Sequence, residues 1–310
     1  MRQFRQFIPV VLVGVLLLLA LSTIRRELGE YRLQDVIQSL DNIPNRRKLI
    51  AIALTGLGYS AMTGYDFLAC RYIRRSLSAF RIAFTSFLSY AFGNTIGFTL
   101  FSGTAIRYRY YASQLTPAEL VKVVVFTHFS FWLGMLAIGG IVFWLDPLTI
   151  PQMLQLPFQS IHPIGMLLVL LAVLYLVLST CLRAPLRIRG QEFGLPSLLL
   201  SLAVIAVSVV DWTLAAGVLY QLLPQDLPLS FFSFFGIYVL AMTAGIVSTV
   251  PGGLGVFEAV ILVSRPAGVS ASEVLGGLLA FRGIYYFLPL LLAGGLALVY
   301  EFLVRRKQAP

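Results

Sequence analysis

Three charged side chains of this sequence lie inside or beside long apolar runs, where they could bind a charged ligand. Asp211 lies near the middle of the apolar run 196–223, Arg282 lies inside the run 275–304, and Glu258 follows a glycine-rich stretch. A charge in apolar surroundings costs a few kcal/mol unless it meets a partner or water. A carboxylate there could take a cation or a proton, and a guanidinium could hold a phosphate. A purely structural ion pair is the alternative.

The stretch before Glu258 contains Pro251, Gly252, Gly253 and Gly255 and is the most informative run of the chain. The proline ends the preceding helix, and the glycines permit a positive φ or a close approach. A new helix can begin by Gly255 with exposed N–H groups, which attract an anion such as a phosphate head group. A tight turn between packed helices is the alternative. No Gly-Lys-Ser or Gly-Lys-Thr follows, so ATP hydrolysis is not indicated.

A second glycine-interrupted segment, 82–106, contains Asn94 and Gly103 and leads into Arg107 and Arg109. Both arginines alternate with tyrosines, a combination that suits phosphate binding and interface anchoring alike. Irregular backbone at membrane depth survives only where protein or water satisfies its polar groups. Two interrupted segments in corresponding places of two halves also indicate a transporter site built from an inverted repeat. The sequence leaves that repeat open.

The remaining chemical inventory is poor for an enzyme. Asp66 stands about one helical turn before Arg71, so a ligand site and a local salt bridge are both open. The sequence has no His-Glu-x-x-His motif and no nucleophile elbow. The two cysteines, Cys70 and Cys181, predict neither a disulfide framework nor a metal site. We therefore expect no metal and no cofactor, and a non-enzymatic role is favoured.

The composition indicates an integral membrane protein. Hydrophobic residues make up 58% of the 310 residues, charged residues only 12%, and the mean hydropathy is +0.87. A soluble domain carries about 25% charged residues. The net charge of +10 does not indicate nucleic acid, because Lys and Arg cluster at the ends of apolar runs. Because no later loop is long enough for a soluble domain, we expect residues 1–310 to form one membrane domain.

The apolar runs predict an all-α, polytopic bundle of about eight spans, because a spanning helix needs roughly 20 apolar residues. Seven runs are clear: 7–24, 49–70, 120–145, 163–182, 196–223, 227–250 and 275–304. The segments 82–106 and 251–264 are apolar but interrupted, and we expect them to be broken or re-entrant. The first run has no convincing cleavage site after it, so we expect a retained signal-anchor helix.

Loop charges predict how the chain crosses the membrane, because cytoplasmic loops are enriched in Lys and Arg. Basic residues at 2–5, 71–81, 183–189 and 305–307 place both termini and two loops in the cytoplasm, and 146–162 has none. The segment 82–106 should then make no net crossing, and 251–264 should supply one of three crossings between 227 and 304. The segment 25–48 has apolar residues at i, i+3, i+4 and i+7, which predicts an interfacial amphipathic helix.

Several of these motifs together resemble a known family. They are Tyr65-Asp66, the stretch from Gly93-Asn94 to Arg107-Tyr108-Arg109, the run from Ser248 to Glu258, and Arg282-x-x-Tyr285-Tyr286-x-x-Pro289. In these the chain resembles the lysylphosphatidylglycerol synthetase/flippase membrane-domain family, over nearly its whole length. That family includes the flippase half of bacterial MprF proteins and stand-alone YbhN-like inner-membrane proteins.

The resemblance implies a helical domain of the bacterial inner membrane that moves phospholipids between leaflets. It also implies that five residues match charged positions important in such domains: Asp66, Arg107, Asp211, Glu258 and Arg282. The cytosolic aminoacyl-transferase domain of MprF has no counterpart in this sequence, so we do not expect synthesis of the aminoacylated lipid, and the substrate is in doubt.

We therefore expect a translocator of anionic or aminoacylated phospholipids, with membrane phospholipids as its partners. The phosphate would meet Arg107, Arg282 or the glycine breaks, and a carboxylate would take a cationic head group or a proton. A membrane-embedded enzyme of lipid or glycan modification is one alternative. A non-catalytic subunit of a cell-envelope complex is the other, and homo-oligomers or other envelope proteins stay open as partners.

Overall fold

The fold is described from a computed structural model of the chain, which covers residues 38, 41–96, 99–146, 160–182, 186–188, 191–224, 227–248 and 251–308. The predicted first span, 7–24, and most of the predicted interfacial helix lie outside these residues.

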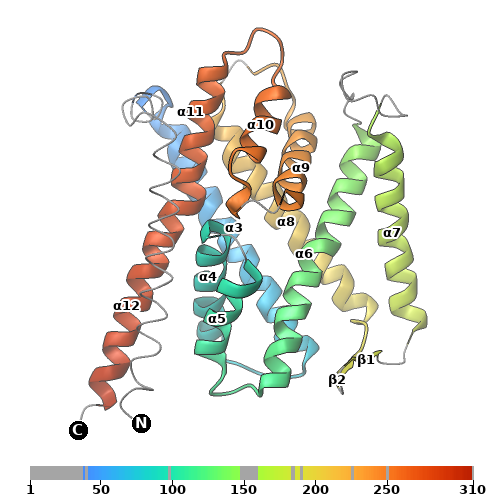
Figure 1. Ribbon diagram of the computed structural model, residues 1–310, viewed down its shortest axis with the longest axis vertical. Helices are drawn as coiled ribbons and strands as arrows, with labels where there is room; N and C mark the ends of the chain where they lie inside the picture. The colour runs from blue at the N-terminus through green and yellow to red at the C-terminus, as the bar shows by residue number, and fades with distance from the viewer. Residues whose placement is uncertain are drawn as a thin grey trace.

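The described residues form a bundle of helices, as the apolar runs predicted, with one small β-hairpin at its end (Figure 1). The helices are α3 (Asn45–Tyr72), α4 (Ala79–Ile96), α5 (Thr99–Tyr111), α6 (Pro117–Leu145), α7 (His162–Cys181), α8 (Leu198–Leu222), α9 (Phe231–Val247), η2 (Pro251–Gly253), α10 (Val256–Val263), α11 (Ala271–Phe281), η3 (Arg282–Phe287) and α12 (Leu288–Gln308). The strands β1 (Leu186–Ile188) and β2 (Gln191–Phe193) pair antiparallel, with Arg187 opposite Glu192.

Four helical stretches of the described chain are long and apolar enough to cross a membrane: Pro117–Leu145, His162–Cys181, Leu198–Leu222 and Ala271–Leu303. The last of these runs through α11, η3 and α12 without a break. Helix α9 is apolar but has only 17 residues. The count of about eight spans therefore stays a prediction.

Helix α6 begins where the sequence places a capping box. Thr116 accepts a hydrogen bond from the backbone of Glu119, and the Glu119 carboxylate accepts one from the backbone N–H of Thr116. Pro117 occupies the first turn, where its missing N–H costs nothing. The side chains of Ser197 and Ser230 cap α8 and α9, each by accepting one hydrogen bond from the backbone of the first turn.

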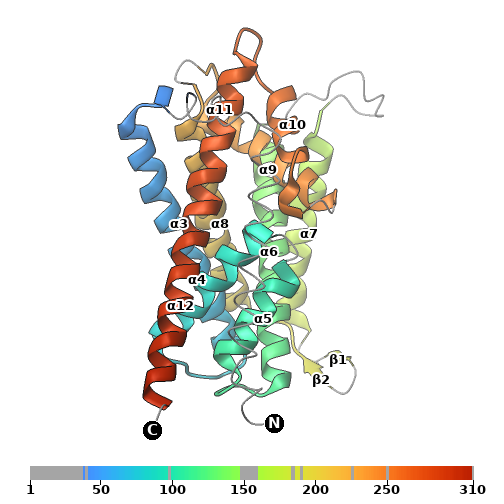
Figure 2. The ribbon, with the colours of Figure 1, turned by 60° about the vertical axis from the view of Figure 1, so that its left-hand side comes forward.

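The described part of the segment 82–106 folds as two helices, of which α4 ends at Ile96 and α5 begins at Thr99. Helices α4 and α5 pack against each other and occupy the lower half of the bundle, and the chain enters and leaves this pair at the same end (Figures 1 and 2). The pair is therefore a helical hairpin, and its re-entry into the membrane stays a prediction.

A second hairpin enters from the opposite end of the bundle. Helix α9 runs inward, η2 reverses the chain, and α10 returns toward the upper end (Figures 1 and 2). The predicted crossing by 251–264 is thereby corrected. The 8 residues of α10 extend about 12 Å, well short of the roughly 30 Å hydrocarbon core. The full crossing in this part of the chain is made by α11, η3 and α12.

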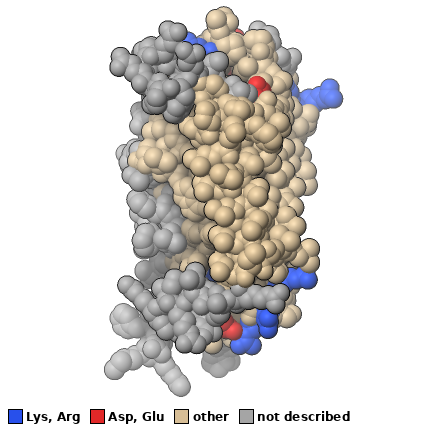
Figure 3. Space-filling model, turned by 90° about the vertical axis from the view of Figure 1, so that its right-hand side faces the viewer, with Lys and Arg blue, Asp and Glu red and all other residues tan. Residues whose placement is uncertain are grey.

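The outside of the bundle is apolar and its charges gather at the ends. Leu170, Leu199 and Leu291 are more than half exposed, as expected for side chains that meet lipid. Figure 3 shows one face on which Lys, Arg, Asp and Glu lie at the two ends of the molecule and not across its middle. The β-hairpin and the end of α12 share one end, and the C-terminal end of α6 lies at the other (Figure 1).

Candidate functional site

Asp66 of α3 and Arg107 of α5 form a buried, two-pronged ion pair. The distance is 2.9 Å from Arg107 Nε to Oδ1 and 2.7 Å from Nη2 to Oδ2, and both residues are at most 1% exposed. Ser86 and Tyr111 donate further hydrogen bonds to the same carboxylate. The guanidinium also lies 5.1 Å from the ring centroid of Tyr90. Every oxygen of the carboxylate is thus engaged.

These contacts decide between the interpretations that the sequence left open. The partner of Asp66 is Arg107 rather than the neighbouring Arg71. Arg107 is buried and therefore does not anchor the chain at an interface. Gly103 makes room for it, because a Cβ at Gly103 would lie 3.2 Å from Arg107 Nη1.

The second buried pair joins Glu258 of α10 to Arg282 at the start of η3. Glu258 Oε1 accepts hydrogen bonds from Arg282 Nε at 2.9 Å and Nη2 at 2.6 Å, and Oε2 accepts one from the backbone N–H of Gly255. Arg282 Nη1 donates to the carbonyl of Gly252 at 3.0 Å. The pair therefore ties η3 to the glycine-rich turn. Glu258 itself occupies the place at the start of α10 where the sequence predicted a bound anion.

The glycines of this turn are required by its backbone. Gly252, Gly253 and Gly255 have φ of 66°, 64° and 76°, which side-chain-bearing residues adopt only at a cost. A Cβ on Gly253 would also lie 3.2 Å from the Cα of Gly245 in α9. Pro251 is the first residue of η2, four positions after Val247, the last residue of α9.

Tyr285 and Tyr286 lie in η3, a stretch of π-helix. Such stretches leave backbone carbonyls for other donors and occur frequently at functional sites. Tyr59 of α3 donates to the carbonyl of Tyr285 at 3.1 Å, and Thr95 of α4 donates to that of Tyr286 at 3.3 Å. The ring of Tyr286 faces the guanidinium of Arg282 at 4.8 Å.

The tips of the two hairpins meet inside the bundle. Thr95, at the end of α4, contacts η3 through its hydroxyl, and a Cβ built on Gly252 would lie 3.8 Å from the Thr95 carbonyl oxygen. Asn94 beside it makes a long contact of 3.9 Å to the sulfur of Met62. The two glycine breaks, far apart in the sequence, therefore pack together.

Asp211 of α8 differs from the other buried carboxylates. It is 6% exposed, its Oδ2 accepts a hydrogen bond of 3.1 Å from Tyr65, and its Oδ1 has no partner. The Tyr65 hydroxyl also lies 3.0 Å from Ser208 Oγ. Arg282 is paired with Glu258, so the structure does not contain an Asp211–Arg282 ion pair. Among the described carboxylates buried in the bundle, Asp211 is the one outside an ion pair.

Comparison with known proteins places this bundle in a family, although no family model matches the chain. An uncharacterized protein of Synechocystis sp. is 42% identical over 308 residues, which are 99% of this chain and 96% of that protein. The inner membrane protein YbhN of Escherichia coli is 30% identical over 249 residues, 79% of this chain and 77% of YbhN. This chain belongs to the YbhN-like family.

A longer protein is also similar to this YbhN-like chain. The phosphatidylglycerol lysyltransferase of Staphylococcus aureus is 26% identical over 284 residues, which are 90% of this chain but 32% of that protein. The chain thus spans about a third of the lysyltransferase. The family resemblance predicted from the motifs is confirmed, and the protein is a membrane protein.

Several side chains that complete the candidate site of this YbhN-like chain were not predicted from the sequence. Glu301 of α12 forms a two-pronged pair with Arg109, at 3.1 Å from Nε and 2.8 Å from Nη2, so Arg109 has a carboxylate partner as well. An acid inside an apolar run was the signal that could have identified Glu301. Tyr65, Ser86 and Tyr111 carry no such signal. Among the described residues, no group of three His, Cys, Asp or Glu side chains could hold a metal ion.

Proposed function

We propose that this protein moves phospholipids with anionic or aminoacylated head groups between the two leaflets of the membrane. The observation that carries the proposal is that each of the two buried arginine–carboxylate pairs has one member, Arg107 or Glu258, on a hairpin. The two hairpins enter from opposite ends and approach each other where Thr95 lies beside Gly252. The similarity to a phosphatidylglycerol lysyltransferase supports a role connected with phosphatidylglycerol.

In this proposal the internal carboxylates stand in for the lipid phosphate while the site is empty. A guanidinium binds carboxylate and phosphate with the same two-pronged geometry. A phosphodiester that enters from one end would displace Asp66 from Arg107, and one that enters from the other would displace Glu258 from Arg282. Each arginine would exchange one anion for another, so that neither cation is left unpaired in the apolar interior.

Asp211 supplies the second half of the proposed chemistry. Its unpartnered Oδ1 is suited to accept the ammonium group of an aminoacylated head group, or a proton. Asp66 and Glu258 are less suited to this task, because their oxygens already accept hydrogen bonds from Arg107 and Arg282.

Reconstitution into liposomes tests the proposal directly. Fluorescent phosphatidylglycerol and lysyl-phosphatidylglycerol would be placed in one leaflet, and their exchange followed by chemical quenching of the outer leaflet. We expect exchange faster than in empty vesicles, and slower exchange with Arg107→Lys or Arg282→Lys, since lysine keeps the charge but loses the two-pronged geometry. The control is Arg75→Gln, because the Arg75–Glu119 pair lies at the surface. Exchange no faster than in empty vesicles would reject the proposal.

A structural role in a cell-envelope complex is the second candidate. It is favoured by the complete pairing of Asp66 and Glu258, which suits a rigid core. The double variant Glu258→Arg with Arg282→Glu separates the two functions. A structural core needs an ion pair of either polarity, whereas a lipid path needs the guanidinium and the carboxylate at their original positions. A wild type that exchanges no lipid, together with a swapped protein that folds as stably as the wild type, would favour the structural role.

A further inference from the structure

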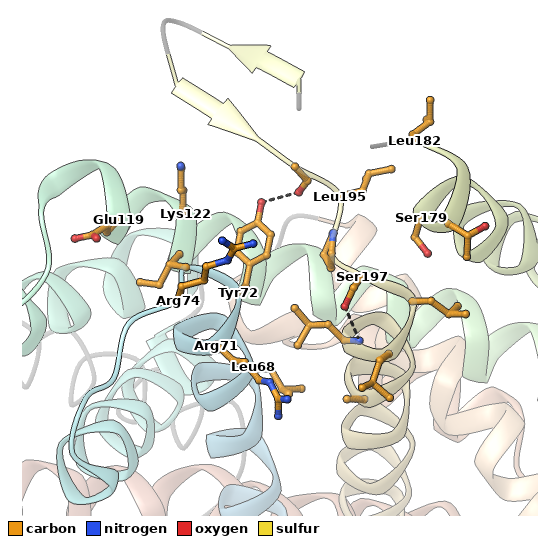
Figure 4. Close-up of a pocket in the computed structure, with 18 residues that line it drawn as sticks. Leu68, Arg71, Tyr72, Arg74, Glu119, Lys122, Ser179, Leu182, Leu195 and Ser197 are labelled. Carbon is orange, nitrogen blue, oxygen red and sulfur yellow. Dashed lines mark hydrogen bonds between the residues drawn. The ribbon is translucent and has the colours of Figure 1, made fainter. Parts of the chain in front are cut away.

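A pocket of about 790 Å³ opens at the end of the bundle where α3 ends and α8 begins. Its wall is built by the end of α3, the first turns of α6, the end of α7 and the segment that leads into α8 (Figure 4). Its described lining contains no member of the two buried arginine–carboxylate pairs. It is therefore a separate place on the molecule, of a size typical for ligand sites.

Three cations line the pocket: Arg71 and Arg74 from the end of α3 and Lys122 from α6. The one acid in the lining, Glu119, is engaged by Arg75 at 2.6 Å and by the Thr116 cap. Over the described chain, none of the three cations forms an ion pair. The pocket thus has an excess of positive charge that the described side chains do not neutralise.

The start of α8 adds to this positive potential. The first N–H groups of a helix have no partner within the helix, and Ser197 satisfies the one at Leu200. The segment that leads into α8 is held in place by Tyr72, whose hydroxyl donates a hydrogen bond to the carbonyl of Gly194 at 2.6 Å (Figure 4). The pocket is therefore a concave place built by several elements rather than a row of charges along one helix end.

The backbone at the end of α3 places Arg71 and Arg74 at the same rim. Arg74, whose φ is 56°, stands where a Schellman motif ends the helix: its N–H donates to the carbonyl of Arg71, and the N–H of Arg75 donates to that of Cys70. The chain turns there beside the pocket, and both arginines line it.

The outer wall of the pocket favours a lipid over a soluble anion. Leu182, Leu198 and Leu199 line it and are 51%, 40% and 72% exposed on the lipid-facing surface. A phosphate held by the cations would have apolar surface directly beside it, on which acyl chains can lie. A free anion would gain nothing from these leucines.

We propose that this pocket binds the phosphate head group of an anionic phospholipid, with the acyl chains on the adjacent leucines. The site does not depend on translocation and would hold a lipid even in a protein that moves none. Basic residues at helix ends also serve as topology signals, but topology alone requires neither a cavity nor a preference for one lipid.

Lipid binding to the purified full-length protein tests this site. Native mass spectrometry would compare phosphatidylglycerol with phosphatidylcholine of the same acyl chains, in the wild type and in the triple variant Arg71→Gln, Arg74→Gln and Lys122→Gln. We expect the wild type to prefer phosphatidylglycerol and the triple variant to bind it at least about tenfold more weakly, because cations near the membrane surface attract anionic lipids. A photoactivatable phosphatidylglycerol should label the end of α3 or the start of α8 in the wild type alone.

The matched control removes three charges at the other end of the bundle, as Arg46→Gln, Lys48→Gln and Arg265→Gln. Equal weakening in the control would show a general charge effect and overturn the proposal. Equal binding of both lipids by the wild type would overturn it as well. Displacement of the lipid by millimolar inorganic phosphate would assign the pocket to a soluble anion. Translocation is measured separately, so failure here leaves the proposed function untouched.

Discussion

Arg107 meets Asp66 with both prongs of its guanidinium, although 41 positions separate the two residues in the chain. Removing two charges from water costs several kcal/mol per ion, and only good geometry with further hydrogen bonds offsets it. Ser86, Tyr111 and Tyr90 supply those further contacts. The stability of the protein should therefore fall strongly when either member of the pair is removed, and much less when both are replaced together.

We predict that Asp66→Ala lowers the free energy of unfolding by about 3–5 kcal/mol, because it leaves Arg107 buried without a counter-charge. The double variant Asp66→Leu with Arg107→Met should recover most of that loss. Denaturant unfolding in detergent measures both. Arg75→Gln serves as the control, since its surface pair should contribute little. A double variant no more stable than Asp66→Ala would contradict this account.

Gly253→Ala should destabilise the protein by at least about 1–2 kcal/mol, the cost of a left-handed conformation for a residue with a Cβ. The new Cβ would also press on Gly245 of α9 at 3.2 Å. Gly56→Ala in α3 is the matched control, because no atom lies within 4 Å of its Cβ position and alanine favours the helix. Thermal unfolding midpoints should therefore move in opposite directions for the two variants.

Gly165→Val should loosen the packing of α7 on α6. A Cβ at Gly165 would lie 2.6 Å from the backbone nitrogen of Trp144, and Gly140 faces Val169 with the same lack of space. Small residues at such places allow two helices to approach closely in a membrane. We expect Gly165→Val to lower the thermal unfolding midpoint. Gly295→Val in α12 should change the midpoint much less, because the Cβ position of Gly295 has open space around it. Similar midpoints for both valine variants would show that the approach of α6 and α7 is not limiting.

Asp211→Asn should leave stability unchanged or higher, because it removes a buried charge and keeps an acceptor for Tyr65. If Asp211 receives the ammonium of an aminoacylated head group, exchange of lysyl-phosphatidylglycerol should fall about tenfold, equivalent to roughly 1.4 kcal/mol, while that of phosphatidylglycerol persists. Loss of both activities would assign a proton to Asp211 instead. Unchanged exchange of both lipids would place Asp211 outside the lipid path.

The sequence identified the charged residues of the candidate site but not their partners. Asp211 and Arg282 stand out because a charge in an apolar run is costly, and that cost is visible in one dimension. Arg107 and Glu258 follow glycine-interrupted segments, and Asp66 belongs to a motif of the family resemblance. The choice of Arg107 over Arg71 as the partner of Asp66 depends on the packing of α5 against α4 and of α4 against α3. No local spacing in the sequence shows this packing. Glu301 was missed for the same reason, because its partner lies 192 positions away.

The path of the chain near its C-terminal end was predicted only in part. Loop charges showed which helix ends lie at the same end of the bundle. They do not distinguish three crossings from a hairpin followed by one crossing, because both arrangements bring the chain to the opposite end. The correction at 251–264 comes from helix length and backbone reversal at Gly252 and Gly253.

By itself, the sequence determined that this chain lies in a membrane, which residues are costly there and where its helices break, because each of these follows from composition and local stereochemistry. The tertiary structure alone decided that the two breaks touch, that Arg107 and Arg282 each hold a carboxylate, and that Asp211 keeps an open oxygen. Pairing is a property of helices brought together by packing, and a buried charge takes the partner that the packing places beside it.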